Sequence, residues 1–409
     1  MFALPFLQIT VFLITCRCFI KSFMKRIFTL FLLFATLQAS SQNPITINVQ
    51  SADISAGDTL RVDHMSLFHY HGVDKTSFFV ADTDGRATIH DAVDSFSRLR
   101  LNIRDNNVTF YADAGQTINI KVNNPKDMEY VTPTGGFYDA PDYYDYISNH
   151  NTFICNKNNA FEKFQFFAGI GANDSVQHYM SLYNSLNGKD DSKRQMEFMK
   201  RTDNQVAVYM FANELGMDNV EKKNFEKQWK KMDEEMKASG AGEYFKQIME
   251  ARKELRSNSQ ARNFSVIDTK GNSVELKSLE GRFVLLYYWG VCGYVLQSWP
   301  VLVDLHEKYG DCLTAIALTK ESTFNQVSSY NEHNTDALLL PLKGLIRDDW
   351  TNVLTDKHGN AKIEEDYLMM ATPCVVLISP KGRIIKHGYA NVLKTAKNRL
   401  RLYSLFHPK

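Results

Sequence analysis

The cysteines are the residues of this 409-residue chain whose chemistry is easiest to define. Beyond residue 41 there are four, far apart in the sequence: Cys155, Cys292, Cys312 and Cys374. They are too few and too widely spaced for a disulfide-rich scaffold, and no pair has the spacing of zinc ligands. Cys292 stands out because it joins an apolar, strand-like run to a helix-like run. A thiolate at the start of a helix is stabilised by free backbone N–H groups, and it can attack a disulfide or a peroxide.

The first 41 residues have the pattern of a secretory signal peptide. Met24-Lys-Arg precedes an apolar run from Ile27 to Leu37, and small residues lead to a cleavage position before Gln42. Residues 1–23 add a second apolar run without a basic start, which we interpret as an over-called start codon. A lipoprotein signal at Cys16 is disfavoured for the same lack of basic residues, and a retained anchor made of both runs is the alternative. We expect an exported protein of the periplasm or cell envelope, where thiols can be oxidised.

Composition narrows the range of partners. The formal net charge is +1, with 47 basic and 46 acidic residues, so the chain has no electrostatic signature of nucleic-acid binding. Its length suggests roughly two or three domains. The apolar stretch from Phe283 to Leu305 contains Gln297, Ser298 and Pro300, and it is typical of a buried strand followed by a helix rather than of a membrane span.

Three segments with different periodicity follow the signal peptide. Residues 42–124 alternate apolar and polar residues in short runs separated by turn sequences, which predicts a small, antiparallel β-sandwich-like domain. Residues 125–258 begin with a linker and continue as a helical segment. Its aromatic residues, Phe161, Phe164, Phe166 and Phe167 among them, are expected in a core, and Phe225 to Met236 on one face of a single helix.

From residue 259 to residue 409 the pattern is that of an α/β domain. A hairpin comes first, and Phe283–Tyr288 is apolar on both faces, as a central strand covered by helices should be. A helix, a second buried strand at Leu313–Leu318 and another helix come next. An antiparallel pair begins at Cys374, and a last helix starts near Val392.

This order of elements, together with several local motifs, resembles the TlpA/ResA-type thioredoxin-like proteins, a redoxin family of thiol–disulfide oxidoreductases. The resemblance begins near Ala261 and extends to the C-terminus. The β-rich segment also resembles, in layout, the small β domain that often precedes such modules in secreted Bacteroidetes proteins. The matching motifs are Phe264-Ser-Val-Ile-Asp with Gly271, Leu276 to Leu286, Cys292 with Pro300, and Tyr367 with Thr372-Pro373 and Val375 to Gly382.

By this resemblance Cys292 is the candidate nucleophile, and Pro373 follows a cis peptide bond beside the active site. The partner groove would be formed by Trp289, Gly293, Tyr294, Val295, Trp299 and Thr372. The family usually has a second cysteine three residues after the first, where this chain has Val295. The nearby family residues also differ: Leu286 replaces a buried acid, Tyr288 and Val291 replace tryptophans, and Leu296 to Ser298 replace charged residues.

These departures concentrate at the site of the chemistry, which indicates loss or change of disulfide reduction. Release of a mixed disulfide needs a second thiol. Cys374, directly after Pro373, is a candidate, although neighbouring strand residues point to opposite faces and a small buried side chain is the simpler interpretation.

We therefore predict a cell-envelope protein of thiol–disulfide oxidoreductase ancestry with one active-site cysteine and weak or altered redox activity. Its partners would be proteins or peptides, with no nucleic acid, cofactor or metal, and with no membrane span unless the N-terminus is retained. The alternative is a non-catalytic peptide-binding module that uses the same groove.

Overall fold

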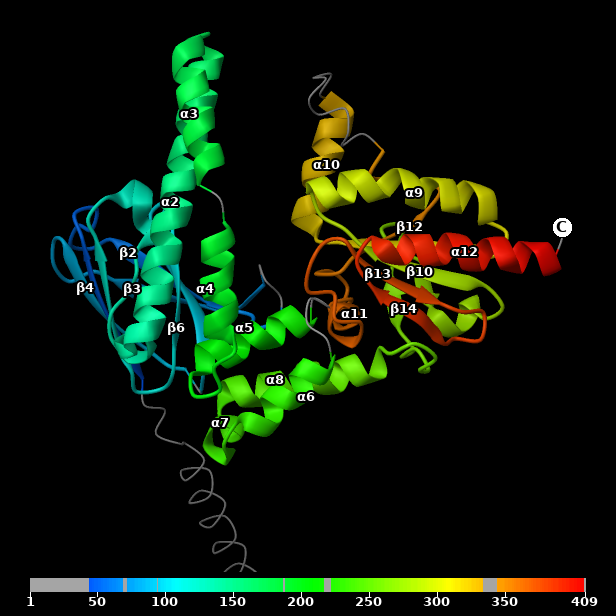
Figure 1. Ribbon diagram of the computed structural model, residues 1–409, viewed down its shortest axis with the longest axis horizontal. Coiled ribbons are helices and arrows are strands. Elements are labelled where there is room, and N and C mark those ends of the chain that lie inside the picture. Colours follow the sequence, from blue (N-terminus) through cyan, green and yellow to red (C-terminus); the bar gives the residue numbers. More distant parts are fainter. Residues whose placement is uncertain are drawn as a thin grey trace, which may run out of the picture.

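The computed structural model of the protein describes residues 44–68, 72–93, 95–186, 188–216, 222–333 and 344–407. The expected signal peptide lies outside the described residues. Figure 1 shows a β-rich region and a C-terminal α/β domain on opposite sides, with several helices between them. Within the described ranges, no helix combines the length and apolar character needed to cross a membrane.

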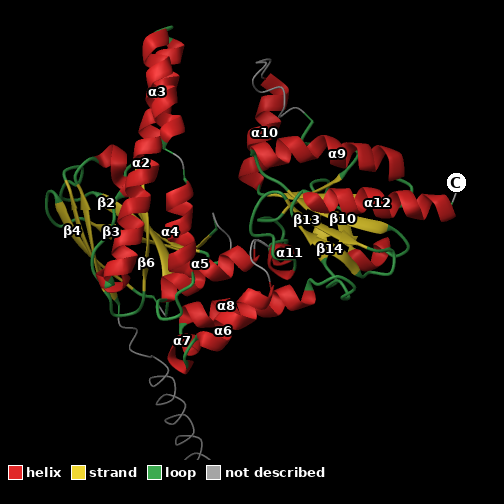
Figure 2. Ribbon diagram, viewed as in Figure 1, coloured by secondary structure: helices red, strands yellow, loops and turns green. Residues whose placement is uncertain are grey.

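The N-terminal region contains two sheets (Figure 2). One has the strand order β4-β1-β7 and the other β3-β2-β5-β6. Every pairing is antiparallel except β1 with β7, which is parallel. The bounds are β1 (Ile45–Ser51), β2 (Thr59–Met65), β3 (Val73–Val80), β4 (Arg86–Asp91), β5 (Ser97–Ile103), β6 (Asn106–Ala112) and β7 (Thr117–Val122).

Alternation of side chains gives the two sheets a shared core. In β1, Ile45, Ile47 and Val49 are buried while the residues between them are not, and the inner residues of both sheets belong to one hydrophobic cluster. The sandwich-like arrangement expected from sequence is therefore present. Strand β3 is difficult to recognise from the sequence because it is an edge strand with no buried residue.

The helical segment begins with a hairpin of α2 (Pro141–Gly169) and α3 (Asn173–Ser185), which projects beyond the sandwich (Figure 1). The expectation that its phenylalanines lie in a core is wrong, because Phe161 and Phe166 are exposed and α3 buries no residue. Their rings pack mainly within the hairpin, as Phe167 does on Tyr179 with ring centroids 5.5 Å apart.

Shorter helices connect this hairpin to the C-terminal domain. The single helix expected through Phe225 and Met236 is two helices, because the Asp233 carboxylate accepts a hydrogen bond from the backbone N–H of Met236 and starts a new one. The helices are α4 (Lys189–Met199), α5 (Gln205–Gly216), α6 (Lys222–Lys231), α7 (Glu234–Ala238) and α8 (Gly240–Glu254).

The C-terminal domain is built on a five-stranded sheet in the order β12-β11-β10-β13-β14. Strands β10, β11 and β12 are parallel, whereas β13 and β14 are antiparallel to their neighbours. With its covering helices this is the thioredoxin-like arrangement. The bounds are β8 (Ser265–Ile267), β9 (Ser273–Glu275), β10 (Phe283–Tyr288), α9 (Gly293–Tyr309), β11 (Leu313–Thr319), α10 (Glu321–His333), β12 (Thr351–Leu354), α11 (Lys362–Asp366), β13 (Cys374–Ile378), β14 (Ile384–Gly388) and α12 (Asn391–Phe406).

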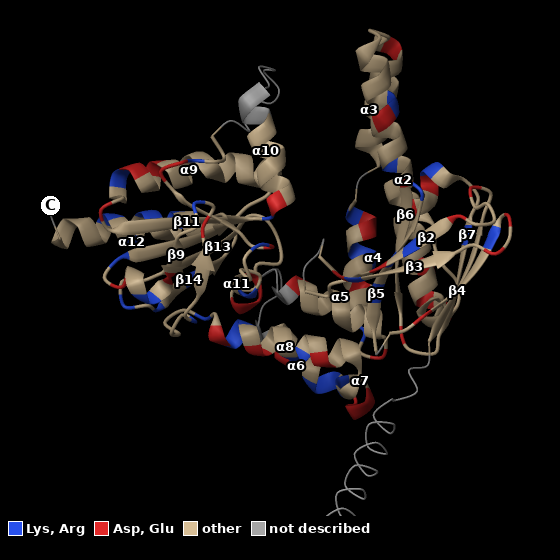
Figure 3. Ribbon diagram, turned by 180° about the vertical axis from the view of Figure 1, so that it is seen from behind, with Lys and Arg blue, Asp and Glu red and all other residues tan. Residues whose placement is uncertain are grey.

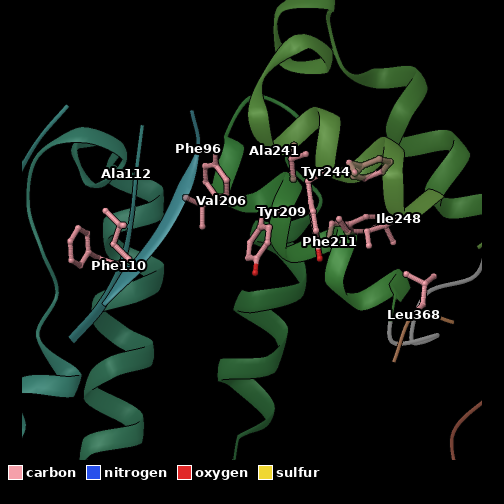
Figure 4. Packing of buried hydrophobic residues seen from close by; sticks show 14 of the residues in the cluster. Phe96, Phe110, Ala112, Val206, Tyr209, Phe211, Ala241, Tyr244, Ile248 and Leu368 are labelled. Carbon is pink, nitrogen blue, oxygen red and sulfur yellow. The ribbon is translucent and has the colours of Figure 1, made fainter. Parts of the chain in front are cut away.

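The two faces of this sheet belong to different cores. Residues 283, 285 and 287 of β10 pack with α9 and α12, whereas residues 284, 286 and 288 belong to the cluster that includes the sandwich and α5 and α8. Figure 4 shows part of the latter: Tyr209 of α5 and Tyr244 of α8 lie side by side, and Leu368 lies beyond Ile248. The helical segment is thus packed onto the back of the thioredoxin-like sheet.

Candidate active site

Cys292 is the N-cap residue of α9. Its carbonyl oxygen accepts the first helical hydrogen bond, from the N–H of Leu296 at 3.1 Å, and no side chain caps the helix there. The thiol is partly exposed.

The thiol lies against the loop that precedes β13. Its Sγ is 3.6 Å from the carbonyl oxygen and 3.9 Å from the Oγ1 of Thr372. The peptide bond between Thr372 and Pro373 is cis, as the family resemblance implied. Gly290 allows this approach, because a Cβ at that position would lie 3.1 Å from Thr372 Oγ1. Cys292, Thr372 and Pro373 are therefore brought together from α9 and β13.

Val295 is directed away from this surface. It lies one helical turn after Cys292, is 0 % exposed and packs in the core between α9 and the sheet. At this position, where the family resemblance places a second cysteine, the aliphatic side chain contributes to packing. Gly293 and Tyr294, in contrast, are exposed beside the thiol.

The structure does not bring Cys374 to the Cys292 thiol, and its side chain is buried, as the simpler of the two interpretations from the sequence expected. It pairs with Tyr288 in the sheet and belongs to the core on the face opposite α9. Its side chain is buried, which raises the pKa of the thiol to about 12. A thiol that stays protonated at neutral pH cannot attack a mixed disulfide. The alternation of side chains along a strand accounts for the difference from Cys292.

A polar cluster surrounds Cys374. The Nε2 of His387 is 3.6 Å from the sulfur and 2.8 Å from the carbonyl oxygen of Tyr367. Its Nδ1 lies 2.7 Å from a guanidinium nitrogen of Arg252 on α8. Burial, reinforced by the Arg252 charge, lowers the pKa of His387 to about 3, so the ring is neutral and accepts the arginine hydrogen bond. This cluster attaches α8 to the sheet.

Two of the expected groove residues are core residues instead. Trp289 is 1 % exposed and Trp299 is also buried, because both point into the cluster between α9 and the sheet. Trp299 packs on Trp350, with ring centroids 5.0 Å apart, and donates its indole N–H to the carbonyl of Gly344. Tyr294, at 74 % exposed, is the aromatic residue that remains available at the surface.

The first turns of α9, next to the thiol, carry no charged side chain. No Lys, Arg, Asp or Glu occurs in α9 before Asp304, and Figure 3 shows the corresponding part of the helix in tan. Val291, Tyr294 and Val301 are exposed there. Such a surface favours contact with apolar groups of a partner.

Sequence reasoning missed one buried pair beneath α9. The hydroxyls of Tyr287 and Ser298 are 2.7 Å apart, and Ser298 also donates to the carbonyl of Tyr294. Leu286 faces the other core. The signal was present in the sequence, since Tyr287 and Ser298 are polar members of otherwise apolar runs.

Among the described residues, the other cysteines and the possible metal ligands do not form a second candidate site. Cys155 lies on α2, where burial and the nearby Asp127 raise the pKa of its thiol. All four described cysteines are free thiols. Over the described ranges, no three His, Cys, Asp or Glu side chains are placed to hold a metal ion.

Comparison with known proteins identifies relatives of the C-terminal domain. Residues 258–387 match the model of the AhpC/TSA family. The thiol-disulfide oxidoreductases ResA of Bacillus thuringiensis and Bacillus anthracis are each 31 % identical over 137 residues, which is 33 % of this chain and 70 % of theirs.

Solved structures give weaker similarities. The thioredoxin domain of a thiol-disulfide oxidoreductase from Bacteroides vulgatus is 22 % identical, with a TM-score of 0.28, over 36 % of this chain and 98 % of that one. A putative thiol:disulfide interchange protein DsbE from Chlorobium tepidum is 17 % identical, with a TM-score of 0.28, over 36 % of this chain and 97 % of that one.

Proposed function

Because the chain belongs, through its C-terminal domain, to the thioredoxin-like thiol–disulfide oxidoreductase family that includes ResA, we propose that it is a monothiol member of that family. Cys292 forms mixed disulfides with partner proteins and depends on an external thiol for release. The signal-peptide pattern of residues 1–41 supports a location in the periplasm or cell envelope.

The proposed step is a thiol–disulfide exchange. The Cys292 thiolate attacks one sulfur of a partner disulfide, the partner S–S bond breaks, and the other partner sulfur leaves as a thiolate. The new bond joins Cys292 to the partner, so there is no net oxidation or reduction. A second thiol, from glutathione or another protein, repeats the exchange and frees Cys292.

One observation carries this proposal. The Cys292 thiol is partly exposed at the start of α9 and contacts the loop of the cis-proline, while Val295 and Cys374 are both buried in opposite cores. The site therefore keeps the attacking group and its partner-binding loop but has no resolving thiol among the described residues.

Trapping a mixed disulfide tests the proposal. The purified protein is mixed with a small aryl disulfide and with oxidised glutathione, and the adduct is located by mass spectrometry. We expect one adduct at Cys292 that Cys292→Ala abolishes and Cys312→Ala, at another partly exposed cysteine, does not. An unmodified Cys292, or an adduct that persists in the Cys292→Ala variant, would contradict the assignment.

A binding module without thiol chemistry is the second candidate. It is favoured by the uncharged surface formed by Val291, Tyr294 and Val301, which suits stable contact. The two functions differ in their dependence on sulfur: a binding module retains its partner after Cys292→Ala, whereas a mixed-disulfide protein loses it.

A further inference from the structure

A cavity of about 220 Å³ lies where three distant parts of the chain meet: the β2–β3 connection, the α4–α5 region and the loop before the cis-proline. We call it the methionine pocket, because each of the last two parts contributes methionine. Its apolar lining consists of Leu67, Phe68, Met199, Tyr209, Met210 and Met370. Gln195, Asn213 and Glu214 supply its polar edge.

Hydrogen bonds hold the walls of the methionine pocket in place. The hydroxyl of Tyr209 donates to the carbonyl of Leu67 at 3.1 Å, which joins α5 to the β2–β3 connection. The hydroxyl of Tyr244 on α8 donates to Asn213 Oδ1 at 2.7 Å. Tyr209 and Tyr244 also pack on each other (Figure 4). The cavity is therefore preformed, and a ligand does not have to order it.

The methionine pocket and the thiol share one loop. Met370 lines the pocket, and Thr372, two residues further on, contacts Cys292 through its carbonyl oxygen. Two residues of extended chain span at most about 7 Å. An extended polypeptide advances about 3.3 Å per residue. With the 3.6 Å contact between the Cys292 sulfur and the Thr372 carbonyl oxygen, the backbone of Met370 lies within roughly 13 Å of the thiol, a length that about four residues of extended polypeptide span.

We propose that the methionine pocket binds one large apolar side chain of the partner, such as leucine, methionine or phenylalanine, close in sequence to the partner's exchanging cysteine. This rests on the proposed function and specifies the partner. The pocket is smaller than the roughly 300–1,000 Å³ sites that enclose whole small molecules. Methionine side chains adapt to different apolar shapes, so the pocket selects for size and polarity rather than for one residue.

A peptide series tests this selection. Each peptide carries one cysteine, activated as a mixed disulfide with an aryl thiol, in a background of serine and glycine, with one variable residue two to four positions away. Exchange transfers the peptide sulfur to Cys292 and releases the aryl thiolate, whose absorbance is followed. We expect leucine, methionine or phenylalanine at one of these positions to raise the rate or equilibrium of transfer roughly tenfold over alanine. Equal transfer for all residues would overturn the proposal.

Variants of the pocket provide the matched comparison. Met210→Ala and Met370→Ala remove contacts from the wall, and we expect the leucine-over-alanine preference to fall to about twofold. Met196→Ala is the control, because Met196 lies on the same helix as Met199 but is 45 % exposed and outside the pocket. For each variant, the peptide rate is expressed relative to that with a small aryl disulfide. A preference that stays the same in all three variants would assign it to another surface.

The failure of the pocket is distinguishable from the failure of the thiol chemistry. If Cys292 does not react even with the small aryl disulfide, the proposed function fails. The pocket is then tested in Cys292→Ser protein with ¹³C-labelled methionine methyl groups and a cysteine-free leucine peptide. Shifts of the Met199, Met210 and Met370 signals without a shift of Met196 would support the pocket, and unchanged signals would overturn it.

Discussion

Cys292 and Cys374 lie on opposite faces of one sheet, and both adjoin the cis-proline loop. Cys292 is the N-cap residue of α9, is partly exposed and contacts Thr372. Cys374 follows Pro373 but points into the core shared with α8, where burial raises its pKa to about 12. The same type of side chain, a cysteine, thus supplies a reactive group on one face of the sheet and contributes packing on the other. Backbone direction and solvent access, rather than distance along the chain, determine which role a cysteine takes.

The largest expected effect comes from adding a second thiol to the Cys292 face. Val295→Cys places a sulfur one helical turn after Cys292, at a position from which a second thiol can attack the mixed disulfide that Cys292 forms. In an insulin-reduction assay the wild type depends on the added reductant to release each mixed disulfide, so we expect the variant to reduce insulin at least roughly tenfold faster than the wild type. Val301→Cys, two turns along the same helix, is the control. If Val295→Cys is no faster than the wild type, the other changes around Cys292 have removed efficient turnover.

Removing the polar cluster on the Cys374 face should destabilise the fold without changing the reactivity of the Cys292 thiol. His387→Ala deprives the Arg252 guanidinium of an acceptor on the back of the sheet, at a cost of about 1–3 kcal/mol. Urea denaturation measures this change, and His178→Ala, at an exposed position of α3, should stay within about 0.5 kcal/mol of the wild type. Equal stabilities would show that the cluster does not hold α8 to the sheet.

The same histidine predicts a pH dependence of stability. Its folded pKa of about 3 lies below the value of about 6.5 for an unfolded chain, so the unfolded state binds more protons between these values. The contribution is fully present above about pH 6.5 and declines as the pH falls towards 3, by at most about 1.4 kcal/mol per pH unit. Denaturation at pH 7 and pH 5 should show a smaller loss for His387→Gln than for the wild type.

A smaller effect is expected from the hydroxyl pair beneath α9. Tyr287→Phe removes the 2.7 Å hydrogen bond to Ser298, which retains its bond to the carbonyl of Tyr294. We expect a loss of about 1 kcal/mol in thermal or urea denaturation. Labelling of Cys292 should change little, because its sulfur contacts Thr372 and neither hydroxyl of the pair. A large drop in labelling would show that the pair positions the thiol.

Much of the C-terminal domain could be predicted because its signals are local. The doubly apolar run Phe283–Tyr288, the helix that follows Cys292 and the Thr372-Pro373 motif each correspond to an observed element. The helices near Phe225 were harder to predict. The helical periodicity of apolar residues continues through Asp233, although the Asp233 carboxylate starts a new helix.

The side chains around the site depend on information that is not local. The register that sets Cys374 opposite Tyr288 decides which face its thiol occupies. Trp289 and Trp299 look like surface aromatics in the sequence, yet they fill the core against Trp350. The methionine pocket combines Leu67, Met210 and Met370, which only the packing of three separate segments brings together.

The central claim is that one of these two cysteines is a working thiol and the other is not. Timed alkylation of the native protein at neutral pH, with each cysteine followed by mass spectrometry, tests it most directly. We predict rapid labelling of Cys292 and protection of Cys374 until the protein is unfolded in urea. Protection of Cys292 in the native protein, or labelling of Cys374 at the same rate, would contradict the account.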